Sequence, residues 1–237
     1  MPVKFNINNV LDLYYAGGGV TNFEPSLKKV LRYLQNDNNV GNIKETAYLL
    51  ATAKSESDYS LSRWESDYLC GEKGVPYVVQ PCQKAIDYYR STDGKSNYFL
   101  KGVDSNGMAY FGRGLIQLTG KSNYEKYGRL AGLGDSLVID GDLAMKPKNS
   151  YKVASAYLKR RTFDYVNSND LTNARRSVNG GTNGVDRTNE EYFMWIDIFS
   201  KPSVKFEASI WTRRNRIAIL LLSFFIVTAT LFIFVKK

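Results

Sequence analysis

The chain has 237 residues, of which 43% are hydrophobic and 23% are charged, a composition typical of globular proteins and not of disordered or fibrous ones. It contains no histidine and two cysteines, which excludes a Ser-His-Asp triad, a Cys-His dyad and a zinc site with four Cys or His ligands. Acid–base chemistry near pH 7 then has to come from carboxylates, Lys, Tyr or the backbone, and we expect no metal ion and no cofactor.

The net charge of +9 is concentrated near one end of the sequence. Residues 213–237 hold five Lys/Arg and no acid, so that residues 1–212 carry 27 bases and 23 acids. This mildly basic balance suits an anionic polymer or an envelope surface. It contains no Lys/Arg run, and we expect no nucleic-acid partner.

Hydrophobic periodicity predicts a mainly helical domain. A helix is predicted from Pro25, where apolar residues follow at helical spacing. Asn42 and Glu45 resemble a capping box and predict a second helix from about Ile43 to about Glu56. Further helices are predicted over Tyr151–Arg161, Asp170–Val178 and Glu190–Phe199.

The middle of the sequence, residues 66–112, holds glycine and proline without sustained periodicity, which predicts loops with a short hairpin. Cys70 and Cys82 enclose eleven residues in this region. A disulfide between them would contribute about 3 kcal/mol in the loop-closure model. Two reduced thiols are the alternative, and the redox compartment decides between the two.

A stretch of 19 residues without a charge, Ile217–Val235, lies between Arg216 and Lys236. As a helix it would be about 28 Å long, against about 30 Å for the hydrocarbon core of a bilayer. A central core helix is the alternative, but the length and the basic flanks favour a transmembrane anchor in contact with lipid. No apolar run of signal-peptide length occurs near the N-terminus, so we expect a tail-anchored protein whose large domain faces the cytoplasm or its equivalent.

Three segments of the sequence stand out together. The first is AKSES with Glu56, followed by Glu65 nine positions later; the second is YFGRGLIQLTGKSNY, from Tyr110 to Tyr124; the third is VNGGTNG, from Val178 to Gly184, followed by Arg187. In these segments, and in their order and spacing, the chain resembles glycoside hydrolase family 19, the group of plant-type chitinases and phage or bacterial endolysins. The resemblance covers roughly residues 40–195.

The resemblance implies a mainly α, α+β lysozyme-like fold, with a bilobal helical domain around a substrate groove. We expect this domain over residues 1–199, a polar linker over 200–212, and the anchor with its basic flanks over 213–237.

The residues themselves point to compatible chemistry. Glu56 at a helix end and Glu65 beyond it in a loop are expected on opposite walls of one groove. Inverting glycoside hydrolysis needs such a pair: one carboxylic acid protonates the leaving oxygen, and a carboxylate about 6.5–9.5 Å away activates a water. The resemblance implies that Glu56 is the general acid and Glu65 the general base.

Other polar residues are candidates for positioning water and substrate. The resemblance implies that Thr119 helps to hold the water. Amide side chains suit hydrogen bonds to N-acetyl and hydroxyl groups, and the alternative for them is a fold-stabilising bond to the backbone; they are Gln117, Asn123 and Asn179. Arg187 is a further substrate-binding candidate. Arg113 and Arg187 also suit pairing with the acids, with a purely structural salt bridge as the alternative.

The sequence departs from the family next to the expected acid, because Ser55 stands where a His is common and Lys54 precedes it. A nearby lysine favours the ionised form of Glu56, whereas burial favours the protonated form that an acid needs. We expect burial to dominate.

Together these features predict an inverting endo-β-1,4-glycosidase that cuts the glycan strands of peptidoglycan. We expect an endolysin of muramidase type, anchored in a viral internal membrane or a host inner membrane and used by a bacteriophage in lysis or penetration of the host wall. The alternatives are a chitinase and an inactive wall-binding membrane protein. The presence of both Glu56 and Glu65 favours an enzyme, since a binding protein needs neither.

Overall fold

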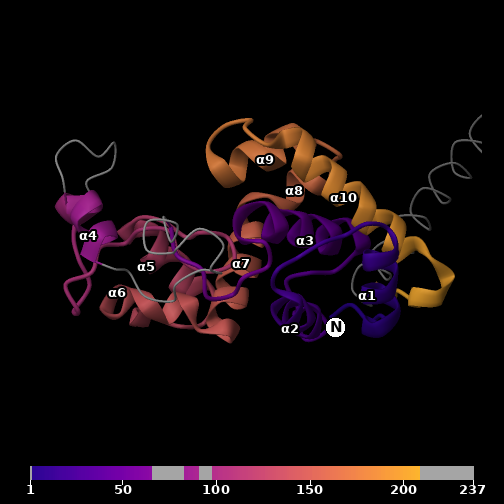
Figure 1. Ribbon diagram of the computed structural model, residues 1–237, viewed down its shortest axis with the longest axis horizontal. Coiled ribbons are helices and arrows are strands. Elements are labelled where there is room, and N and C mark those ends of the chain that lie inside the picture. The colour runs from indigo at the N-terminus through magenta and orange to yellow at the C-terminus, as the bar shows by residue number, and fades with distance from the viewer. Residues whose placement is uncertain (1, 66–82, 91–97, 209–237) are drawn as a thin grey trace, which may run out of the picture.

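The computed structural model describes residues 2–65, 83–90 and 98–208. These residues form helices joined by loops, with isolated β-bridges and no longer strand among them (Figure 1). In chain order the helices are α1 (Ile7–Ala16), α2 (Glu24–Leu34), α3 (Ile43–Ser57), α4 (Gln83–Arg90), α5 (Lys121–Leu130), α6 (Ser136–Ile139), α7 (Pro147–Arg161), α8 (Phe163–Asn167), α9 (Leu171–Asn179) and α10 (Val185–Ser200). Three 3-10 turns are η2 (Tyr98–Lys101), η3 (Gly141–Met145) and η4 (Pro202–Val204).

Helix α3 lies at the centre of the molecule and is buried along most of its length, because α10, α7 and α8 pack around it. Its first turn is capped as the sequence predicts: the side chain of Asn42 accepts a hydrogen bond from the N–H of Glu45 at 3.0 Å. The Glu45 carboxylate accepts the N–H of Gly41 at 2.7 Å. The helix ends at Ser57, and the next residue, Asp58, has a φ of 51° in the left-handed region. Glu56 therefore occupies the last turn of a firmly packed helix.

The helices predicted from periodicity are confirmed, although two of them begin earlier than predicted, α7 at Pro147 and α10 at Val185. Five helices were not predicted: α1, α4, α5, α6 and α8. Of these, α4 lies within residues 66–112, where loops were predicted. The buried face of α5 consists of Tyr124, Tyr127 and Gly128 on an otherwise polar helix, so it has little aliphatic periodicity to detect.

The buried apolar side chains of the described residues form two clusters. The larger one joins all the described helices except α4. The smaller one gathers Trp64, Tyr89, Ala109, Phe111 and Met145. In Figure 1, α4, α5 and α6 lie toward one end of the molecule and α1, α2 and α10 toward the other, with α3 and α7 between them.

Residues 202–207 pack against the N-terminal segment. Lys4 and Glu207 exchange backbone hydrogen bonds of 3.0 and 2.8 Å, Val204 is fully buried, and the Phe206 ring stacks on Phe5 with centroids 6.2 Å apart. The folded domain therefore continues at least to Glu207, past the boundary expected at residue 199. The first part of the expected linker 200–212 belongs to the domain, because its few apolar residues have partners that only the tertiary fold supplies.

Within the described residues, no helix combines the length and the apolar character that a membrane crossing requires. The predicted anchor, Ile217–Val235, lies outside the described residues. The same holds for Cys70 and Cys82.

Candidate active site

A cavity of about 430 Å³ brings together most of the residues predicted from the motifs. It is lined by Glu56 of α3, Glu65, residues 116–119, Asn123 of α5, Tyr157 of α7, and Val178 and Asn179 of α9. Six of the seven predicted site residues therefore meet in one place. Arg187 is the exception: it is exposed on α10 and is not among the described residues that line the cavity.

Glu56 is held by an arginine from another helix. Its side chain is 18% exposed, and its Oε1 accepts a hydrogen bond from Nη1 of Arg175 in α9 at 2.5 Å. The Nε of Arg175 donates to the carbonyl of Asn183 at 3.0 Å. This pair links α3 to α9 and fixes the Glu56 carboxylate at the cavity wall.

Glu65 is positioned by the segment that contains Gly112. The N–H of Glu65 donates to the Gly112 carbonyl at 2.6 Å, and the N–H of Gly112 donates to Oε2 of Glu65 at 2.9 Å. The hydroxyl of Tyr98 donates to the other carboxylate oxygen at 3.2 Å. A Cβ at position 112 would lie 3.2 Å from both Cβ and Oε2 of Glu65, so glycine is what permits this close approach. The two carboxylates thus reach one cavity from separate elements.

The loop that carries Thr119 is braced by its own polar side chains. Gln117 has a φ of 52°, and its Nε2 donates to the carbonyls of Gly114 at 2.9 Å and Arg63 at 3.3 Å. The Thr119 hydroxyl donates to the Gln117 carbonyl at 2.9 Å, and Nδ2 of Asn123 donates to the Thr119 carbonyl at 2.7 Å. The amide nitrogens of Gln117 and Asn123 therefore stabilise the fold. Both residues line the cavity, and their amide oxygens are able to accept hydrogen bonds.

Asn179 performs a similar bracing role at the end of α9. Its Nδ2 donates to the carbonyl of Asn183 at 2.8 Å, and its Oδ1 accepts the N–H of Gly181 at 2.9 Å. Gly180 ends the helix with a φ of 77°. Asn179 lines the cavity from this turn, and its contact with a substrate stays a prediction.

The cation beside Glu56 is Arg175, which the motifs did not identify. Lys54, expected to act on Glu56, instead forms an ion pair with Asp58 at 2.6 Å. A signal for Arg175 was present in the sequence, because it lies in the helix predicted over Asp170–Val178, four residues before the candidate Asn179. Residues four apart lie on one face of a helix that continues to Asn179, as α9 does.

Arg113 and Arg187 do not pair with the cavity carboxylates in the described residues. Arg113 is 1% exposed and forms an ion pair with Asp142 at 2.8 Å, so it takes the structural alternative. Arg187 acts electrostatically on Glu191.

The remaining titratable group in the cavity lining is Tyr157. Burial raises the pKa of Tyr157, and its hydroxyl donates to the carbonyls of Ser177 and Val178 at 3.1 and 3.2 Å. It stays protonated near pH 7, which leaves acid–base chemistry to Glu56 and Glu65. Among the described residues, no group of three or more His, Cys, Asp or Glu is arranged to hold a metal ion.

Comparisons with known proteins agree with this architecture. No family model matches the chain. A glycosyl hydrolase family 19 domain-containing protein of Haemophilus influenzae is 36% identical over 81 residues, which are 34% of this chain and 38% of that protein. The match thus spans well under half the length of this relative.

Two solved structures resemble the chain over most of its length. A chitinase C mutant has a TM-score of 0.53 and 17% sequence identity, covering 84% of this chain and 94% of that one. A bacterial family 19 chitinase has a TM-score of 0.52 and 19% identity, covering 81% of this chain and 93% of that one. The chain therefore has the mainly helical fold of family 19 chitinases.

Proposed function

We propose that the chain is an inverting glycoside hydrolase that cleaves β-1,4 bonds in a glycan of N-acetylated sugars. The observation that carries this proposal is the single cavity in which Glu56 and Glu65 meet, each held by partners from a different element. The family 19 chitinase fold of the chain and the local match to a family 19 domain support the same conclusion.

In the proposed reaction Glu56 donates a proton to the leaving oxygen while Glu65 takes a proton from the attacking water. Donors on both oxygens of Glu65 orient it as the base. The Thr119 hydroxyl donates its hydrogen to the Gln117 carbonyl. Its oxygen can therefore interact with the water only as a hydrogen-bond acceptor. The hydrogen bond from Arg175 to Oε1 holds Glu56 at the cavity wall, where the proposed reaction needs the acid.

The proposed substrate is peptidoglycan, with chitin as the second candidate. Both polymers present N-acetyl N–H groups, which suit the amide oxygens of Gln117 and Asn123 as acceptors. The proposed role is that of a bacteriophage protein used in lysis or penetration of the host wall, because such a protein would need both a wall hydrolase and a membrane anchor.

The test of catalysis compares Glu56→Gln and Glu65→Gln with Glu125→Gln, which changes a glutamate of α5 outside the cavity. Each cavity variant is expected to lose about 10²–10⁴-fold in turnover of peptidoglycan or chito-oligosaccharide, because each removes one proton-transfer group. Glu125→Gln should keep wild-type activity. NMR of the fresh product should show the α-anomer; a retained β-anomer, or more than half of the activity in Glu56→Gln, would contradict the proposed mechanism.

We further propose that Ile217–Val235 anchors the chain in a membrane, on the strength of its uncharged length and basic flanks. The full chain is then expected in the membrane fraction after carbonate washing. A chain ending at Glu207, where the packed domain still includes Val204 and Phe206, should be released and active. Release of the full chain by carbonate would argue against the anchor.

A further inference from the structure

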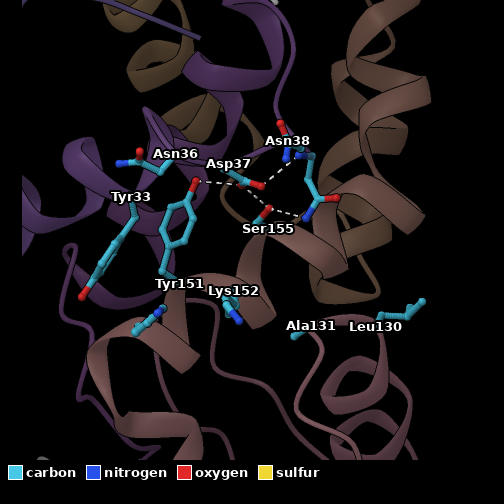
Figure 2. Close-up of a pocket in the computed structure, with 11 residues that line it drawn as sticks. Tyr33, Asn36, Asp37, Asn38, Leu130, Ala131, Tyr151, Lys152 and Ser155 are labelled. Atoms are coloured by element: carbon cyan, nitrogen blue, oxygen red, sulfur yellow. Dashed lines mark hydrogen bonds between the residues drawn. The ribbon is translucent and has the colours of Figure 1, made fainter. Parts of the chain in front are cut away.

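A second cavity, of about 310 Å³, lies on the other side of α7 and shares no lining residue with the active-site cavity (Figure 2). The end of α2 with the loop 36–39, the end of α5, and the first turns of α7 line it. Helix α7 contributes to both cavities. At about 100° per residue, Tyr157 in the active-site cavity points roughly opposite to Ser155 in the second one. Nothing in the proposed reaction uses this second cavity.

The floor of the second cavity is formed by polar groups that are hydrogen-bonded to Asp37. Figure 2 shows the hydroxyls of Tyr151 and Ser155 pointing toward the Asp37 carboxylate. The Tyr151 bond measures 2.9 Å, and the N–H of Asn39 donates to the other oxygen of Asp37 at 2.8 Å. Burial, with Asp37 beside it, raises the pKa of Tyr151, so this hydroxyl remains a donor. The charge of Asp37 is therefore met by hydrogen bonds from within the domain.

The rim of the cavity is cationic. Lys148 and Lys152 lie one turn apart on α7, both are exposed, and neither has an ion pair with another described residue. Every exposed side chain of α7 is a lysine or an arginine, and the helix contains no acid. Asp37 already accepts three hydrogen bonds from groups of the domain and forms no ion pair with Lys148 or Lys152. The ammonium groups of these two lysines can therefore attract an anion from solution.

The other lining residues suit a sugar. The Tyr33 and Tyr151 rings lie with centroids 5.3 Å apart, and Asn36 and Asn38 present exposed amides at the edge of the cavity. The half-buried Tyr33 ring and the exposed amides offer an apolar face together with donors and acceptors, which is the combination an N-acetylated sugar needs. The volume lies at the lower end of the range for ligand pockets and is sufficient for one substituted sugar unit.

We propose that this cavity is a second, non-catalytic glycan site, which takes an N-acetylated sugar whose substituent carries a carboxylate. Tyr33, Asn36 and Asn38 contact the sugar, and Lys148 and Lys152 bind the carboxylate. The inference rests on the proposed function, because it assumes that a glycan is the polymer on which the protein acts. It also selects between the two substrates: the peptides attached to peptidoglycan carry carboxylates, whereas chitin is neutral.

The test measures binding without turnover. The full chain with Glu56→Gln, kept in detergent, is sedimented with insoluble peptidoglycan sacculi or with chitin, with and without the pair Lys148→Gln and Lys152→Gln. We expect the double substitution to weaken binding to sacculi about tenfold, since it removes two charge contacts, and to change binding to chitin less than twofold.

The matched control removes the same charge elsewhere. Lys126→Gln with Lys159→Gln neutralises two exposed lysines of α5 and α7 that do not line this cavity, and it should leave binding to sacculi unchanged. Sacculi whose carboxylates are amidated should bind the Glu56→Gln chain as weakly as untreated sacculi bind the double variant. Equal losses in both lysine pairs would show general charge attraction and overturn the proposal, as would equal binding to native and amidated sacculi.

The two proposals fail separately. Suppose that the chain with an intact Glu56 cleaves a short soluble oligosaccharide, but that replacing Lys148 and Lys152 does not change binding to sacculi. Then only the proposal of a second site is wrong. If the chain cleaves no glycan at all, the proposed reaction is wrong, and the sedimentation result still decides the second site.

Discussion

Replacing Arg113 with glutamine removes a buried guanidinium from the segment next to Gly112, on which the position of Glu65 depends. Arg113 is 1% exposed. Its Nε donates to Asp142 at 2.8 Å, and its Nη1 donates to the Ala109 carbonyl at 2.9 Å and to the Tyr124 hydroxyl at 3.0 Å. Glutamine is too short to make all three contacts.

The expected loss of stability depends on how deeply Arg113 and its ion-pair partner Asp142 are buried. Removing one partner of a buried pair costs about 3–5 kcal/mol. The side chain of Asp142 is 39% exposed, so water compensates it in part, which favours the lower end of that range. The Ala109 carbonyl loses a donor, which adds about 1 kcal/mol. We expect a total of about 4 kcal/mol, or a melting temperature lower by about 10 °C in a domain of this size.

Urea unfolding of the purified chain, checked by thermal melting, measures this loss. Arg129→Gln is the matched control, because Arg129 also contacts two carboxylates, Glu125 at 3.1 Å and Asp135 at 2.7 Å, but its side chain is 58% exposed. It should leave the free energy of unfolding nearly unchanged, because solvent screens both contacts. If Arg129→Gln destabilised the chain as much as Arg113→Gln, or if Arg113→Gln cost less than about 1 kcal/mol, burial would not be the deciding factor.

Two further substitutions test the site and its surroundings. Gly112→Ala should lower turnover at least tenfold with little change in melting temperature, because the added Cβ displaces Glu65, whereas Gly181→Ala, which meets nothing within 4 Å, should be neutral. Burial raises the pKa of Glu191, and its Oε2 has no hydrogen-bond partner among the described residues, so its ionisation opposes folding as the pH rises above the unfolded value. Glu191→Gln should therefore stabilise the protein at pH 7 and lose this advantage below about pH 4, as pH-dependent melting would show. An advantage independent of pH would contradict the ionisation argument.

Local sequence was sufficient for the helices whose apolar residues recur at helical spacing. The cap at Asn42 and the periodicity after Pro25 depend on residues within one or two turns, so they are visible without the fold. The helix α5 was missed because tyrosines on a polar background form its buried face. The extension of the domain past residue 199 was missed because Val204 is buried against chain that is about 200 residues distant in sequence.

The candidate site was predicted from the motifs through their resemblance to glycoside hydrolase family 19, and the structure brings Glu56, Glu65 and Thr119 to one cavity. Sequence could not decide which charged groups meet. Arg175 pairs with Glu56 across 119 positions, while Lys54, two positions from Glu56, turns to Asp58.

The second cavity is entirely a product of tertiary structure. Its floor joins Asp37 to Ser155 across 118 positions, and its rim adds residues from the end of α5. Each contributing segment, taken alone, has the composition of an ordinary polar surface. Periodicity and caps are local and can be recognised within one segment, whereas a charge pair or a binding surface exists only after packing has placed distant segments side by side.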